Sequence, residues 1–314
     1  MNLVNLSSRR MTGCRRSSSQ TVSESQNGAS NMLGDTRAIL FQTELEWPPV
    51  EFGNFRVGPT FVRRLYNAMF EPDFSDYHYD NLDLQGKPPT LSRQSEDGRR
   101  WICQLRERSL FVEDRWPSNP QSWMDEYGKA PPKSRLDEFV KAVQAVAGAA
   151  QHVATEIGCE LPPIFVQRCK IQCLSQPLGS RGSLQLLAGK VARVMDVIAP
   201  FGRPPSYFGV RFRFSPCDIE RGDNTTQHRD FATVRFETFT EDASQVWMEV
   251  AAAHLATEGP LSFDDPGPIQ ANIKKSYDFL TEKCREFLNQ FDELPDGDDA
   301  EDDTDEGETD EDGH

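Results

Sequence analysis

The chain has 314 residues, a formal net charge of −16 and a hydrophobic fraction of 37% that includes 20 Phe. This length suits two domains, or one domain built from two similar halves, with enough apolar residues for a real core. No apolar run approaches the roughly 20 residues of a membrane span, and no apolar segment follows the basic residues near the N-terminus. These features argue against a membrane or secreted protein.

The acidic charge is concentrated at the C-terminal end. Residues 292–314 contain 14 acidic and no basic residues, whereas residues 1–37 carry a net +3. Residues 38–291 therefore hold only about −5 of the total, which is close to balance for their size. The low pI describes the C-terminal segment rather than the folded part.

The seven cysteines fit a reducing compartment. Most of them fall inside strand or helix patterns, so we expect buried, reduced thiols in a cytoplasmic protein. Cys169 and Cys173 would lie about 13 Å apart on a regular strand, too far to bind one metal ion. The sequence contains no Cys-x-x-Cys pair, and we expect no zinc and no other cofactor.

The first half of the chain alternates strand-like and helix-like patterns. Residues 1–36 lack apolar periodicity and are expected to be disordered. The elements that follow are a strand over 39–47, a helix from Pro59, strands over 74–84, 90–94, 101–106 and 109–115, and a long helix over 134–157. Asp97-Gly98 is a favourable hairpin turn, and Ser134 with Asp137 resembles a capping box.

The second half begins with a strand, turn, helix and strand between residues 163 and 214. Phe165, Cys169, Ile171 and Cys173 share one face of its first strand, and a turn at 179–182 leads into a helix over 183–198. The next strand places Phe208, Val210, Phe212 and Phe214 on one face and Arg211 and Arg213 on the other.

Four further elements complete this half. They are a polar loop over 216–229, a strand over 231–239, a short helix that contains Trp247 and His254, and a long helix from Pro268. His254 falls on the apolar stripe of the short helix, so we expect a core histidine with one hydrogen bond.

The two halves repeat the order strand, helix, antiparallel strands, long helix. Their first strands are offset by 125 residues, their first helices by 124 and their long helices by 134. Offsets this similar are typical of a duplicated unit, although the residues match poorly. We expect an α+β fold with a mainly antiparallel sheet, helices on one face and two β-α-β-β-α-like halves over 37–160 and 161–291, followed by a disordered acidic tail over 292–314.

Several segments resemble a sporadically distributed family of uncharacterised prokaryotic proteins. These are the meander WICQLRERSLFVEDRW with Trp123 and Tyr127 after it, the strand PIFVQRCKIQC, the strand DFATVRFETFT, and a terminal helix that follows a short one. The resemblance covers about 38–291. It implies no catalytic residues.

The sheet face opposite the helices would carry the polar member of each strand. Candidate binding residues on this basic face are Arg106, Arg168, Lys170, Arg211 and Arg213, and Arg181 in the turn at 179–182 could assist an anion. We therefore favour a non-enzymatic binding module that takes nucleic acid or a protein partner, without a membrane role. The acidic tail would add solubility, bind a basic surface or cover this face.

The alternative is an enzyme, or a protein that binds a metal ion or small ligand, with its site between the two halves. Asp218, Asp223, His228 and Asp230 gather in or next to the 216–229 loop and could bind a divalent cation or transfer protons. A polar loop accounts for the same residues more simply.

Overall fold

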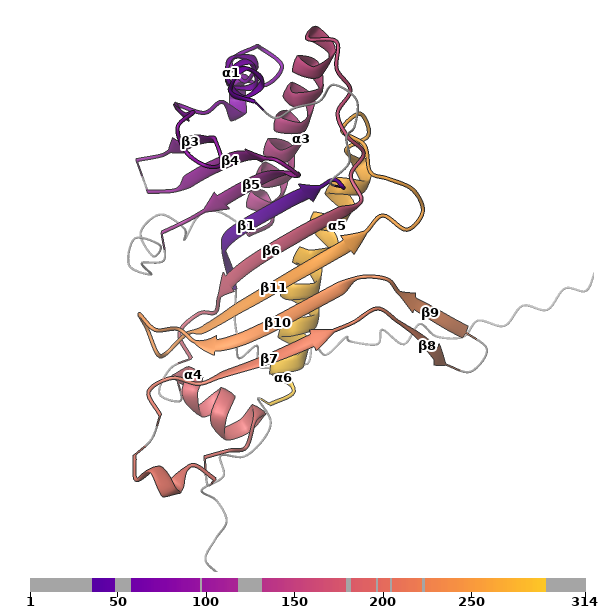
Figure 1. Ribbon diagram of the computed structural model, residues 1–314. Coiled ribbons are helices and arrows are strands. Elements are labelled where there is room, and N and C mark those ends of the chain that lie inside the picture. The colour runs from indigo at the N-terminus through magenta and orange to yellow at the C-terminus, as the bar shows by residue number, and fades with distance from the viewer. Residues whose placement is uncertain are drawn as a thin grey trace, which may run out of the picture. The chain divides into compact units, whose positions relative to one another are not determined.

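The computed structural model describes residues 36–48, 58–96, 98–117, 132–178, 182–195, 197–203, 205–221 and 224–291. A nine-stranded antiparallel sheet has the order β2-β3-β4-β5-β1-β6-β11-β10-β7, and β8 and β9 form a separate hairpin (Figure 1). The strands are β1 Arg37–Glu46, β2 Asn81–Asp83, β3 Thr90–Gln94, β4 Arg100–Arg106, β5 Ser109–Arg115, β6 Val166–Leu174, β7 Gly209–Phe214, β8 Cys217–Arg221, β9 Asn224–His228, β10 Phe231–Thr238 and β11 Val246–Leu255.

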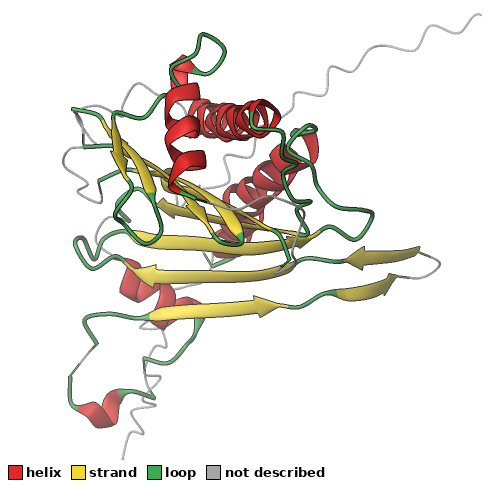
Figure 2. Cartoon of the chain, turned by 45° about the horizontal axis from the view of Figure 1, so that its top comes forward, coloured by secondary structure: helices red, strands yellow, loops and turns green. Residues whose placement is uncertain are grey.

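The helices cover one face of the sheet. They are α1 Pro59–Ala68, α3 Pro132–Glu156, α4 Gly182–Leu184, α5 Gly267–Asp278 and α6 Arg285–Asn289; single turns of 3-10 helix lie at Ser75–Tyr77 and Ala199–Phe201, and π-helical turns at Gln185–Val191 and Phe279–Cys284. Figure 1 shows α3 and α5 behind the sheet, and Figure 2 shows the hairpin β8–β9 extending beyond it. The expected α+β architecture is confirmed, with an antiparallel sheet as its main element.

Four strands lie on each side of the boundary between β1 and β6, and β2 adds a fifth strand beyond β3 on the first side. On one side β1 is followed by β5, β4 and β3, and on the other β6 is followed by β11, β10 and β7. The two long helices, α3 and α5, occupy matching positions in the chain order of the two halves. In chain order, β1, α1, β3, β4, β5 and α3 are followed by β6, α4, β7, β10, β11 and α5.

The core lies between the sheet and its helices. Phe41 of β1 is fully buried, with its ring centroid 5.4 Å from that of Phe139 on α3 and 5.8 Å from that of Tyr277 on α5. Gln167 of β6 is also fully buried, and its Nε2 donates to Thr43 Oγ1 at 3.1 Å and to the Ile269 carbonyl at 3.0 Å. These contacts of the central strands hold both long helices on one sheet.

Three expectations for secondary structure were wrong. Residues 246–255 form strand β11 rather than a short helix, because Val246, Met248, Val250, Ala252 and His254 also alternate with period two and pair on both sides. The polar loop over 216–229 is the hairpin β8–β9. The strand expected over 74–84 is shortened to β2 by a 3-10 turn at Ser75–Tyr77.

Local details differ within two elements that were expected. The helix after the 179–182 turn is helical only to Val191, and Arg193 has a φ of 51° in the left-handed region. Phe165 is 43% exposed, whereas the polar Gln167 occupies the buried face of β6. Asp97 and the side chain of Ser134 lie outside the described residues, although Gly98 has the positive φ of 82° expected in the hairpin turn.

Among the described residues, no helix is both long enough and apolar enough to cross a membrane.

Candidate binding face and a buried polar line

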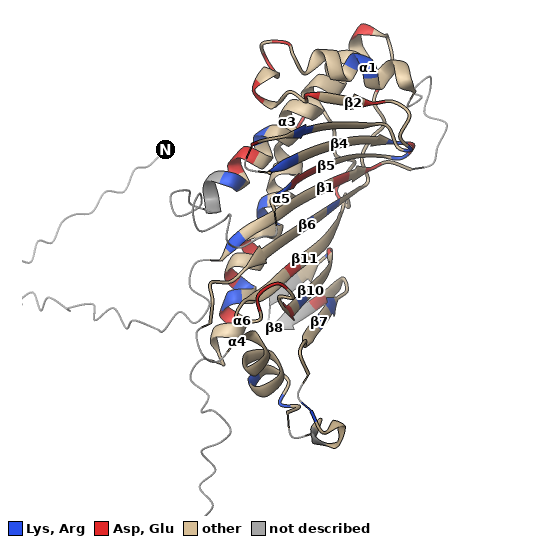
Figure 3. Ribbon diagram, turned by 90° about the vertical axis from the view of Figure 1, so that its left-hand side faces the viewer, with Lys and Arg blue, Asp and Glu red and all other residues tan. Residues whose placement is uncertain are grey.

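The face opposite α3 and α5 is here called the open face, and Figure 3 marks basic and acidic residues on neighbouring strands of the sheet. Successive residues of a strand point to opposite faces of the sheet, so the open face carries the side chains that alternate with those of the core. Arg106 Nη1 lies 2.7 Å from Glu44 Oε1, and the same oxygen accepts a hydrogen bond from Ser109 Oγ at 2.6 Å. Arg168 pairs with Glu46, whose hydrogen bond raises the pKa of the guanidinium above its ordinary value.

A second group of paired charges lies across β6, β11 and β10. Lys170 Nζ is 2.9 Å from Glu249 Oε2, which also accepts from Gln172 Nε2 at 2.7 Å. Arg235 pairs with both Glu249 and Glu237, and its guanidinium lies 5.1 Å from the Trp247 ring centroid. The centre of the open face is therefore largely self-neutralised, including the predicted binding residues Arg106, Arg168 and Lys170.

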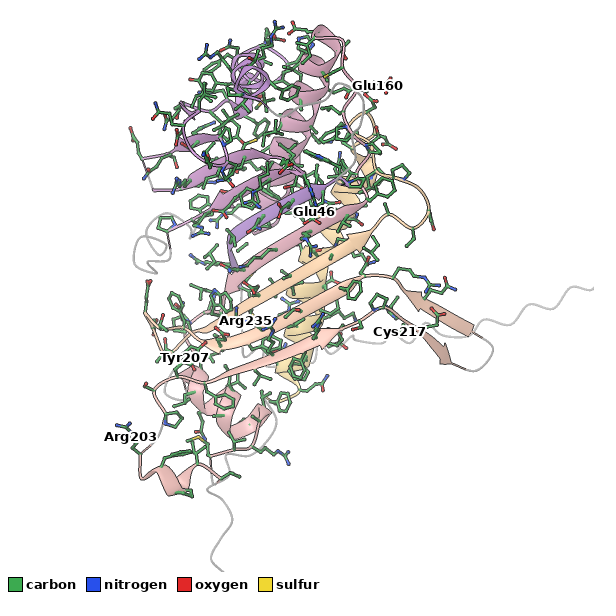
Figure 4. All side chains as sticks on the ribbon, viewed as in Figure 1. Glu46, Glu160, Arg203, Tyr207, Cys217 and Arg235 are labelled. Carbon is green, nitrogen blue, oxygen red and sulfur yellow. The ribbon has the colours of Figure 1, made fainter. Side chains whose placement is uncertain are left out.

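Arg211 and Arg213 differ from these residues because both are exposed and neither forms an ion pair within the described part of the chain. They lie on the edge strand β7, opposite Arg235 and Thr233 of β10. Tyr207 lies just before β7 and is 43% exposed. Partial burial favours the neutral phenol and raises the pKa of Tyr207 to about 12. Figure 4 places Tyr207 near Arg235, at the same end of the sheet. Strand β7 therefore presents two exposed arginines that form no ion pair with a described residue, at the edge of the open face.

Small side chains and one exposed ring adjoin these arginines. Across the strands, Arg213 pairs with Thr233, Thr233 with Ala251, and Ala251 with Lys170. Only the small side chains of Thr233 and Ala251 therefore lie between the two cations. At 4.8 Å per strand the Cα atoms of Arg213 and Lys170 are about 14 Å apart. Phe231 is 40% exposed and lies across from Ala253. We call the set Arg211, Arg213, Phe231, Thr233, Ala251 and Ala253 the β7 patch.

The residues proposed for a metal site are not brought together. Asp218 and His228 are exposed on the hairpin β8–β9, and Asp218 pairs with Arg229 at 3.1 Å. Asp230 instead contacts Lys275 and His254. Asp223 lies outside the described residues, as does Arg181. Across the described ranges, no three His, Cys, Asp or Glu residues are placed to hold a metal ion.

Asp230 begins a line of polar groups that enters the core, which the sequence patterns did not reveal. Its Oδ1 lies 3.2 Å from His254 Nδ1, and His254 Nε2 lies 2.8 Å from Ser276 Oγ on α5. Burial lowers the pKa of His254 more than the charge of Asp230 raises it. Burial raises the pKa of Asp230, but Lys275 and His254 outweigh this effect and hold it below its ordinary value.

This line has the Asp, His, Ser order of a hydrolytic triad but the surroundings of a structural contact. Ser276 is 2% exposed, and its hydroxyl donates to the Asn272 carbonyl at 3.0 Å. The neighbouring thiol of Cys169 is fully buried, and the loss of solvation raises its pKa to about 12. Neither group is presented to a substrate, so we interpret the line as a contact that holds α5 against β11. His254 is thus buried as expected, with a carboxylate as an additional neighbour.

Comparison with known proteins gives no family and no curated relative, since no family model and no curated protein matches. Two solved structures share 10% identity with the chain. One is a CRISPR associated protein Cas6, with a TM-score of 0.14, over 71% of this chain and 90% of that one. The other is the immunity protein TplEi of T6SS from Pseudomonas aeruginosa, with a TM-score of 0.16, over 79% and 90%. Similarity at this level supports no conclusion about fold or function.

Proposed function

We propose that this chain is a non-enzymatic binding module that takes single-stranded nucleic acid on the β7 patch. The observation that carries the proposal is the pair Arg211 and Arg213, which stay exposed and unneutralised on a face whose other predicted cations are paired. Uncompensated cations attract phosphates and release condensed counterions when they bind them.

The remaining members of the β7 patch suit a single strand better than a duplex. Phe231 offers an exposed ring on which a base could stack, and sequence-tolerant stacking is common in single-strand binding. Thr233, Ala251 and Ala253 leave a low surface beside it, on which an extended chain could lie without steric conflict. Arg106, Arg168 and Lys170, which are paired with carboxylates, are assigned a supporting role at most.

The alternative enzymatic or metal-dependent site near residues 216–230 has less support. Asp230 is engaged by Lys275 and His254, while Asp218 is engaged by Arg229. A ligand that used these carboxylates would first have to break those ion pairs.

The test is a fluorescence anisotropy titration with labelled single-stranded DNA and RNA, on the full chain and on a chain that ends at Phe291. We expect binding that weakens as salt rises. Phe231→Ala should reduce the affinity roughly fivefold to a hundredfold, because stacking contributes about 1–3 kcal/mol per base. Phe70→Ala, at a ring that is 49% exposed near α1, is the matched control and should have little effect. If neither form binds at low salt, or if both substitutions act alike, the proposal is refuted.

We further propose that the two halves descend from one duplicated unit and that the chain belongs to the sporadic prokaryotic family that its segments resemble. The support for duplication is the matching order of four strands on each side of the β1–β6 boundary, with β2 as an extra strand, together with the repeated order of elements. Superposition of β1, β3, β4 and β5 on β6, β7, β10 and β11 should then align the strands in order and direction. If they align only in a different chain order, the duplication is refuted.

A further inference from the structure

The described part of the chain ends at Phe291, next to the edge of the sheet that carries the β7 patch. Phe287 of α6 lies 5.5 Å from Phe212 of β7 and 5.6 Å from Phe236 of β10, measured between ring centroids. Phe291, two residues after α6, is 5.4 Å from Phe287. The last described residue therefore packs beneath the same strands whose other face carries Arg211 and Arg213, as Figure 1 shows for α6 and β7.

The path from this point to the open face is short. β7 is the last strand of its sheet, so no further strand of that sheet stands between the two faces there. Residues 292–314 could span about 80 Å if extended and about 25 Å as a relaxed coil. Crossing the edge of one sheet requires on the order of 10 Å. The segment is therefore long enough to reach the β7 patch in either form.

Opposite charge favours contact between residues 292–314 and the β7 patch. It holds 14 acidic residues and starts with Asp292 and Glu293, directly after Phe291. Arg211 and Arg213 are exposed cations without an ion pair in the described residues, and a tethered partner acts at a high effective concentration. Carboxylates present the same kind of charge to a guanidinium as phosphates do.

We propose that residues 292–314 fold back around the edge strand β7 and dock on the β7 patch, where they compete with the ligand. The competition rests on the proposed function, but the docking does not. The segment would then act as an intramolecular substitute for nucleic acid, and a strand that binds many phosphates at once would displace it.

The test couples carboxylates to amines with a zero-length carbodiimide reagent in the full chain. Arg211→Lys with Arg213→Lys keeps the charge and supplies amines on β7, and Arg63→Lys with Arg64→Lys supplies two exposed amines on α1 as the matched control. Coupled peptides are identified by mass spectrometry at low and high salt.

Docking predicts several-fold more coupling of 292–314 to β7 than to α1 at low salt, and loss of this excess at high salt. Equal coupling yields on β7 and α1, or a yield on β7 that does not change with salt concentration, would overturn the docking proposal. The nucleic acid titration fails or succeeds separately: coupling to β7 without nucleic acid binding would refute the proposed function and leave the docking intact.

Discussion

Replacing both exposed arginines of the β7 patch should change the salt dependence of binding by a calculable amount. Arg211→Gln with Arg213→Gln removes two phosphate contacts, each of which contributes about −0.7 to the slope of log affinity against log salt for a single strand. The slope should therefore become less steep by about 1.4. Between 50 and 200 mM salt, the unsubstituted protein should lose about sevenfold more affinity than the variant.

The assay is an anisotropy titration at four or more salt concentrations, on a chain that ends at Phe291 so that the acidic segment cannot compete. Arg63→Gln with Arg64→Gln on α1 removes the same charge from another exposed surface and is the control. A variant whose slope equals that of the unsubstituted chain, or a control with the same change of slope, would refute the assignment of these arginines to phosphate contacts.

Three further predictions concern the described core. Asp114→Asn removes the buried carboxylate whose Oδ2 lies 2.8 Å from Nη2 of Arg99, while Glu138 stays beside the same guanidinium, and should lower the free energy of unfolding in urea by about 1.5–3 kcal/mol; a loss below about 1 kcal/mol would contradict the role of this pair. Because burial lowers the pKa of His254 in the folded state, the unfolded state binds more protons at this residue, so its contribution to stability is complete above about pH 6.5 and is lost as pH falls; His254→Gln should flatten the dependence of unfolding free energy on pH below about 6.5, and an unchanged slope would contradict this assignment. Iodoacetamide at neutral pH should modify the exposed Cys217 before Cys169, as mass spectrometry can check, and the reverse order would contradict the buried thiol.

The alternation of apolar residues in strands and their spacing by three and four in helices predicted most of the elements. A strand or helix that buries one face repeats its apolar residues with a fixed period. Strands β3 and β5 lie where the sequence placed them, and β4 begins one residue earlier than expected. Residues 246–255 satisfy both periods, since their Ala-rich centre favours a helix locally while Val246, Met248 and Val250 alternate. Pairing with β6 and β10 decides between them, and pairing is a tertiary property that local patterns do not contain.

The candidate site shows the same limit. The sequence placed Arg211 and Arg213 on the polar side of a strand, and the structure has them there, exposed. It also grouped Lys170 with them as a binding residue. Lys170 is neutralised by Glu249, which lies on the neighbouring strand β11 but is distant in sequence. Only the register of β6 with β11 reveals this pair. The line from Asp230 through His254 to Ser276 was missed for the same reason.

Photocrosslinking of a single strand to the protein tests the central claim most directly. A single-stranded oligonucleotide with halogenated pyrimidines would be irradiated with the chain that ends at Phe291, and the crosslinked residues would be mapped by mass spectrometry. The proposed function predicts crosslinks at Phe231 and on β7, with a yield that falls when Arg211 and Arg213 are replaced by Gln. Crosslinks confined to the helical side of the sheet, or an unchanged yield in that variant, would contradict it.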